Sequence, residues 1–129
     1  PPQQTEQPDA KVRARLARPT TWCRIAWEGE EPAGAVGVAE HDDGHDRAYL
    51  WVLFVRTEWW GTGLATRLHA AALAEMEGRG NTVADLWTPR ENRRARRFYE
   101  REGWRVTAAE RPTDIGLPEV QYSRDLTPS

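Results

Sequence analysis

The sequence contains a single cysteine, no long apolar run and no excess of charge of either sign. Cys23 has no second cysteine with which to form an intramolecular disulfide, which argues against a disulfide-stabilised secreted scaffold and favours a cytoplasmic location. Because no apolar stretch approaches the roughly 20 residues of a membrane-spanning helix, we expect no membrane partner. Residues 1–19 also lack the apolar core of a secretory signal.

The charge balance gives no reason to expect nucleic acid as a partner, since 18 basic and 20 acidic residues leave a net charge of −2. Lys11 is the only lysine, and we attribute the dominance of arginine to the nucleotide composition of the source genome. The chain has 129 residues, enough for one domain with one core. Its seven tryptophans are expected to fill that core or to line an apolar pocket.

Hydrophobic periodicity and turn residues divide the chain into short elements. We expect residues 1–10 to be disordered or a linker and residues 11–129 to form one domain. The patterns predict helices over 11–18, 63–77 and 92–102, and strands over 21–28, 33–39, 49–55, 82–87, 105–110 and 120–126. This order predicts an α/β sandwich in which helices cover a mixed sheet.

The strand over 49–55 is continuously apolar, so we expect a central strand that is buried on both faces. It leads into a turn containing Gly61 and Gly63, followed at once by a helix. The first amides of a helix have no partner within it, so a bare turn of this kind suits phosphate oxygens. The Walker A and dinucleotide-binding patterns are not satisfied. The alternative is a turn that simply needs two glycines.

The last helix carries three residues on one face, because Asn92, Ala95 and Tyr99 follow a spacing of i, i+3 and i+7. Asn92 offers an amide at the helix entrance, Ala95 leaves room and Tyr99 presents a hydroxyl. We expect Phe98 and Trp104 to point elsewhere and to anchor the helix to the sheet.

These two segments together resemble the GCN5-related N-acetyltransferase (GNAT) superfamily. The run Trp60-Gly61-Thr62-Gly63-Leu64-Ala65 is similar to its acyl-CoA loop. The run Asn92-x-x-Ala95-x-x-Phe98-Tyr99-Glu100-x-x-Gly103-Trp104 is similar to its second signature, with tryptophan in place of the commoner final phenylalanine. The resemblance covers roughly residues 21–126 and implies a mostly antiparallel mixed sheet with splayed central strands.

The resemblance implies an acetyl-CoA-dependent N-acetyltransferase in which a primary amine of a small molecule or protein attacks the thioester directly, with no metal. Tyr99 would protonate the departing thiolate or hydrogen-bond its sulfur. A backbone amide of the strand over 49–55 would serve as the oxyanion contact. The cofactor-binding residues would be the main chain of Phe54 and Val55, Asn92 with Ala95, and the amides of Trp60, Gly61, Thr62, Gly63, Leu64, Ala65 and Thr66.

Three departures from the family pattern stand out. Trp60 occupies the position of an arginine or glutamine, which weakens the side-chain contribution there. The strand and helices that usually precede the first hairpin are reduced or absent, whether by nature or because the chain is a fragment. No carboxylate or histidine lies on the strand over 49–55, so the general base is left open between Glu40, Glu58 and water.

Other groups have plainer interpretations. The loop holding His41, Asp42, Asp43, His45 and Asp46 is more typical of a hairpin turn than of a metal site. His69 is expected at the surface or an edge of its helix. Arg93, Arg97 and Arg101 form a solvated stripe, and Arg96 or Arg97 is an alternative contact for the phosphates of CoA. A non-catalytic acyl-CoA-binding or partner-interaction domain remains the alternative function, a fragment that completes its sheet through another chain is a weaker one, and a homodimer is left open.

Overall fold

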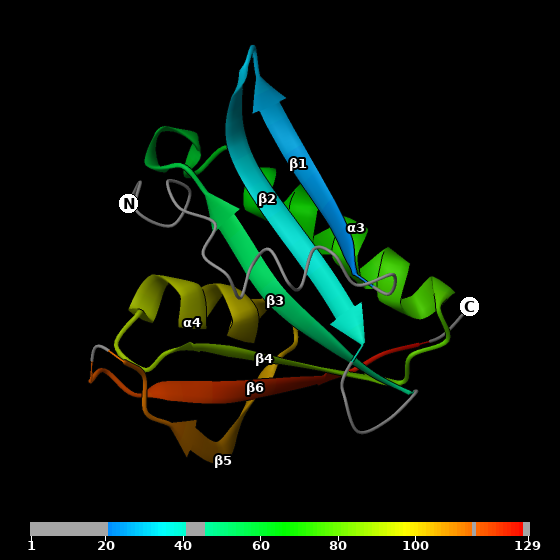
Figure 1. Cartoon of the computed structure of the whole chain (residues 1–129), viewed down its shortest axis with the longest axis vertical. Helices are drawn as coiled ribbons and strands as arrows, with labels where there is room; N and C mark the ends of the chain where they lie inside the picture. Colours follow the sequence, from blue (N-terminus) through cyan, green and yellow to red (C-terminus); the bar gives the residue numbers. More distant parts are fainter. Residues whose placement is uncertain (1–20, 41–45, 115, 128–129) are drawn as a thin grey trace.

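The computed structural model describes residues 21–40, 46–114 and 116–127 (Figure 1). The predictions for residues 1–10 and for the helix over 11–18 lie outside these residues, as does the loop over 41–45, for which a hairpin turn was preferred to a metal site; of the residues named there, only Asp46 is described. The strands are β1 (Trp22–Glu28), β2 (Glu31–Glu40), β3 (Arg47–Val55), β4 (Val83–Pro89), β5 (Arg105–Arg111) and β6 (Glu119–Asp125), and the helices are α3 (Leu64–Gly78), α4 (Arg93–Arg101) and the 3-10 turn η1 (Thr57–Trp59).

The strands form one six-stranded sheet in the order β1-β2-β3-β4-β6-β5. Every neighbouring pair is antiparallel except β3 and β4, which run parallel because α3 connects them. The mixed, mostly antiparallel sheet with covering helices is therefore confirmed. Gly29 and Glu30 form the turn of the first hairpin, and Gly29 takes a positive φ of 61° that favours glycine.

The core lies between the sheet and the helices. α3 contributes Leu64, Leu68, Ala72 and Met76 to it, at the spacing that predicted an amphipathic helix. The helix comes so close to β2 that a Cβ on Gly34 would lie 3.0 Å from a methyl group of Leu68 and 2.7 Å from the carbonyl oxygen of Phe54. Only glycine fits this approach without displacing the backbone.

The central strand β3 is not buried on both faces as predicted. Ala48, Leu50 and Phe54 are buried, whereas Tyr49, Trp51, Val52, Leu53 and Val55 are only half-buried. The register with β2 shifts at this strand, because Gly37 pairs with Val52 and Val38 pairs with Leu50. The extra residue, Trp51, packs its indole over Gly37, where a Cβ would lie 2.6 Å from the ring.

Tryptophan fills less of the core than the sequence predicted. Trp104 is the only one of the seven that is fully buried, and Trp27 and Trp60 are exposed. In the described ranges, no helix combines the length and apolar character needed to cross a membrane.

Candidate functional site

Strands β3 and β4 splay apart in the middle of the sheet. They pair only at Arg47 with Val83, Ala48 with Ala84 and Tyr49 with Asp85, and the described residues form no further pair between them. Figure 1 shows the two strands separating from that point toward their carboxyl ends. The backbone groups that the rest of β3 turns toward β4 are therefore left without a strand partner.

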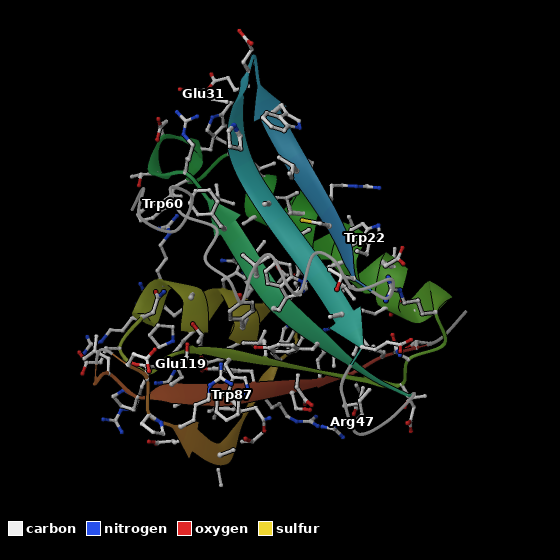
Figure 2. The ribbon with its side chains drawn as sticks, viewed as in Figure 1. Trp22, Glu31, Arg47, Trp60, Trp87 and Glu119 are labelled. Atoms are coloured by element: carbon white, nitrogen blue, oxygen red, sulfur yellow. The ribbon has the colours of Figure 1, made fainter. Side chains whose placement is uncertain are left out.

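An ion pair fastens the strands at the point where they still touch. Arg47 on β3 donates to Asp85 on β4, with 2.6 Å between Nη2 and Oδ2 and 3.2 Å between Nε and Oδ2. Figure 2 shows Arg47 at the amino-terminal end of β3, where that strand lies beside β4. The buried carboxylate of Asp85, which the sequence analysis did not single out, is thus committed to holding the strands together.

The loop between β3 and α3 leaves several amides bare. α3 begins after Gly63, whose φ is 86°, with no side-chain cap and no acidic residue in the first turn. The amides of Trp60 and Thr62 are already bonded, to the carbonyl oxygens of Thr57 (3.1 Å) and Trp59 (3.4 Å). Of the seven amides expected to hold a diphosphate, those of Gly61, Gly63, Leu64, Ala65 and Thr66 therefore have no partner in the described ranges.

Trp60 lies beside the carboxyl end of β3, where β3 and β4 are separated. Its indole Nε1 donates to the carbonyl oxygen of Val55 at 3.0 Å, which is a main-chain group that the sequence analysis assigned to the ligand. The Arg94 guanidinium of α4 stacks over the indole ring at 4.1 Å from its centroid. Figure 2 shows Trp60 beside the carboxyl end of β3. Trp60 thus links the loop to α4 through a cation–π contact.

Arg94 has no ion-pair or hydrogen-bond partner in the part of the chain that the structure describes. Sequence reasoning missed this residue, and no periodicity or motif singles it out from its arginine neighbours. Arg96, one of the two arginines considered for phosphate contact, is instead committed to the fold: it donates to the Tyr122 hydroxyl at 2.9 Å and to the Arg90 carbonyl oxygen at 2.8 Å.

The start of α4 is capped. The Asn92 side-chain oxygen accepts a hydrogen bond from the Ala95 amide at 3.1 Å, so at least part of this side chain serves the helix itself. Ala95 is half-buried and Tyr99 is buried, which places both on the inward side of the helix as the spacing predicted. Arg93, Arg97 and Arg101 are exposed, so the solvated stripe is confirmed.

Tyr99 is a buried phenol whose hydroxyl has no hydrogen-bond partner within the described residues. Burial raises the pKa of Tyr99 to about 12, so the hydroxyl keeps its proton across the neutral range. Its ring meets the rings of Phe98 at 5.6 Å, Trp104 at 6.0 Å and Tyr122 at 6.1 Å between centroids. Trp104 belongs to the hydrophobic core and Phe98 packs against it, so both anchor α4 as predicted, although their rings also contact Tyr99.

The prediction of a surface position for His69 was wrong. The side chain is 1% exposed, and its Nε2 accepts from the Trp104 indole Nε1 at 2.9 Å. Burial and, to a smaller extent, Arg124 lower the pKa of His69 to about 4. The signal was in the sequence, because His69 precedes Ala72 and Met76 by three and seven residues and so lies on the apolar face of α3.

The two glutamates considered as bases differ in position. Glu40 pairs with Ala48 at the end of the sheet where β3 and β4 are still joined, away from Trp60. Glu58 lies in the loop but is exposed and ion-paired with Arg56, whose hydrogen bond lowers the pKa of the Glu58 carboxyl. A depressed pKa makes a carboxylate a weaker base, so this geometry favours neither residue.

The sequence matches the model of the acetyltransferase (GNAT) family over residues 1–104. Similar solved structures include an acetyltransferase from Thermus thermophilus, with a TM-score of 0.72 at 21% identity over 90% of this chain and 71% of that one. Another is the ribosomal-protein-S18-alanine N-acetyltransferase of Escherichia coli, with 0.74 at 20% identity over 92% and 77%. An aminoglycoside 6′-N-acetyltransferase complexed with coenzyme A gives 0.73 at 18% identity over 93% and 80%.

At these identities the structures establish the likeness of fold alone. The chain spans less of some other solved chains, down to 64% of one from Thermoplasma volcanium. A search of curated proteins finds no match.

Proposed function

This chain belongs to the acetyltransferase (GNAT) family, and we propose that it transfers the acetyl group of acetyl-CoA directly to a primary amine of a small molecule or a protein. The observation that carries this proposal is the convergence of two unsatisfied regions. Beyond Tyr49 the backbone of β3 stays paired with β2 but loses its pairing with β4, and the uncapped start of α3 lies just beyond the same strand.

These regions suit the two polar parts of acetyl-CoA. An extended pantetheine arm, which carries amide groups, fits the unpaired edge of β3 near Phe54 and Val55. The diphosphate fits the bare amides at the start of α3, where the helix dipole favours negative charge. Because Trp60 already bonds the Val55 oxygen, its indole either shares that oxygen with the ligand or swings away when the ligand binds.

Tyr99 is the residue to which we assign the leaving group. The attacking amine must lose a proton and the CoA thiolate must gain one when the carbon–sulfur bond breaks. A phenol with a pKa of about 12 is protonated and able to donate. Since a thiol has a pKa of about 8.5, full transfer from this phenol is uphill, and we assign Tyr99 chiefly the hydrogen bond to sulfur.

No carboxylate is needed to complete this scheme. The amine attacks in its neutral form, and water carries its proton away, which is consistent with Glu58 being ion-paired and Glu40 being remote. A single cysteine favours the cytoplasm as the place where this reaction occurs.

The test is turnover of acetyl-CoA with a panel of small amines and peptide amino termini, followed by chromatographic detection of CoA. A thiol reagent would also react with the exposed Cys23 and is unsuitable. We expect Tyr99→Phe to lower kcat about 100-fold and to leave KM for acetyl-CoA within about 3-fold, because a hydrogen bond to the sulfur strengthens as charge develops there in the transition state and contributes little to binding.

Tyr122→Phe is the matched control, since the Tyr122 hydroxyl is bonded to Glu100 at 2.6 Å and to Arg96, and so serves the fold. It should lower stability and preserve kcat. An unchanged kcat in Tyr99→Phe would remove Tyr99 from the mechanism. Tight CoA binding without turnover of any amine would favour the alternative of a non-catalytic acyl-CoA-binding domain.

A further inference from the structure

A buried hydrogen bond joins α3 to the segment just beyond α4. His69 of α3 is 1% exposed, Trp104 beyond α4 is 2% exposed, and 2.9 Å separates the imidazole Nε2 from the indole Nε1. An indole carries a donor and no acceptor, so a buried indole needs an acceptor close by. The neutral imidazole is that acceptor, and its Nδ1 then carries the proton and faces the Glu102 carboxylate at 3.7 Å.

This bond is in direct contact with the aromatic rings around Tyr99. The edge of the Trp104 ring meets the Tyr99 ring at an interplanar angle of 68°, and the Trp104 amide donates to the Tyr99 carbonyl oxygen at 2.9 Å. On the other side, His69 meets Phe98 edge-on with centroids 5.5 Å apart, and Phe98 meets Tyr99 at 5.6 Å. Two of the rings that hold Tyr99 therefore touch His69.

Tyr99 depends on this packing for its direction. Its hydroxyl forms no hydrogen bond within the described residues, so no polar contact there fixes the phenol. A group that must meet a sulfur atom within hydrogen-bond distance loses rate steeply when it is displaced. The orientation of Trp104 and Phe98 thus becomes part of the orientation of Tyr99.

We infer that His69 is a positioning residue for Tyr99, acting through the Trp104 indole. The inference rests on the proposed function, in which the Tyr99 hydroxyl meets the sulfur of the thioester. A phenylalanine at position 104 would need no acceptor. The tryptophan introduces a buried N–H, and the imidazole on the neighbouring helix both satisfies it and fixes the rotation of the indole.

A double-mutant cycle on kcat tests the inference. In His69→Leu, which leaves the indole unpaired, we expect kcat per folded molecule to fall about 10-fold while KM for acetyl-CoA stays within about 2-fold. In His69→Gln, whose amide oxygen can replace Nε2, kcat should return to within about 3-fold of the wild type. In a Trp104→Phe background, adding His69→Leu should change kcat by less than about 2-fold, because the link is already gone.

The indole N–H resonance of Trp104 gives a readout that does not depend on activity. It should lie downfield in the wild type and His69→Gln and move upfield in His69→Leu. If His69→Leu does not fold, His69→Met fills the same space with a much weaker acceptor and is judged by the same criteria.

The outcomes separate the inference from the proposed function. A shifted indole resonance with unchanged kcat in His69→Leu would overturn the positioning role while leaving Tyr99 in place. So would an equal loss of kcat from His69→Leu in the wild-type and Trp104→Phe backgrounds, because the effect would then not pass through the indole. If Tyr99→Phe itself leaves kcat unchanged, the role of Tyr99 and this inference fall together.

Discussion

The two α-helices in the described part of the chain, α3 and α4, begin in opposite ways. α4 begins at Asn92, whose side chain accepts the Ala95 amide at 3.1 Å. α3 begins at Gly63 in the left-handed region, with no cap and no acidic side chain in its first turn. A capped start satisfies the helix from within, whereas an uncapped start leaves its amides to solvent or to a bound anion. The difference separates a helix start that serves stability from one that is free to serve a ligand.

The largest expected effect concerns His69, whose hydrogen bond to Trp104 joins α3 to the segment beyond α4. The pKa of His69 is lowered to about 4 by burial and by Arg124, against about 6.5 in the unfolded chain. The unfolded state therefore takes up a proton at a higher pH than the folded state. Above pH 6.5 the imidazole is neutral in both states and does not reduce the free energy of unfolding. As the pH falls from 6.5 to 4, the unfolded state is protonated first, and the free energy of unfolding decreases by about 3 kcal/mol.

Urea denaturation at several pH values between 7 and 4 measures this loss, and His69→Leu provides the comparison. Carboxylates as a class titrate in the same range, so the difference between the two proteins is what isolates the imidazole. The difference in unfolding free energy should narrow as the pH falls. Parallel curves would mean that His69 titrates as it does in the unfolded chain.

The second effect tests the uncapped start of α3. Gly63→Ala places a side chain at a φ of 86°, and Gly80→Ala does the same at a φ of 85° in the turn after the helix. Both changes should lower the free energy of unfolding by about 1–2 kcal/mol through backbone strain. Only Gly63→Ala should also lower kcat/KM for acetyl-CoA, by about 100-fold or roughly 2.7 kcal/mol, because it disturbs the amides assigned to the diphosphate.

Equal kinetic losses in the two variants would break the distinction, since the loss would then follow from stability and not from the site. Neither glycine is crowded: a Cβ at Gly80 meets nothing within 4 Å, and one at Gly63 meets only an Arg67 nitrogen at 3.4 Å.

The smallest effect tests the capped start of α4. Asn92→Ala removes the acceptor for the Ala95 amide and should lower the free energy of unfolding by about 1 kcal/mol. Asn92→Asp keeps an acceptor and should retain most of the stability, as measured by thermal or urea denaturation. If Asn92→Ala raises KM for acetyl-CoA more than about 10-fold while stability hardly changes, then Asn92 serves the ligand and the contrast between the two starts is lost.

Much of the fold could be predicted from local sequence signals. Glycine and proline punctuate the chain, and each described strand and helix lies within two residues of its predicted bounds. The short turn at Thr57–Trp59 has no periodicity and was not predicted. The burial of β3 on both faces was wrong, because a run of apolar residues does not reveal a register shift that moves Trp51 over Gly37.

The candidate site was less accessible to sequence reasoning than the fold. The glycine loop and Tyr99 follow from motif spacing, but the contacts of single side chains do not. Arg94 and Trp60 are in contact although 34 positions separate them in the sequence, and His69 and Trp104 are in contact at a separation of 35 positions. Contacts of this kind depend on how α3 and α4 pack together, and a single sequence contains no record of that packing.

The sheet consists of two three-stranded halves that are joined only by the short pairing of β3 with β4. Within the described ranges, three register pairs join β1-β2-β3 to β4-β6-β5, and the Arg47–Asp85 ion pair adds to them. A ligand that binds along the unpaired edge of β3 supplies hydrogen bonds that β4 does not, and so adds to the stability of the sheet while it is bound. Occupancy should therefore slow hydrogen exchange of amides in residues 51–55 and stabilise the sheet where β3 and β4 do not pair.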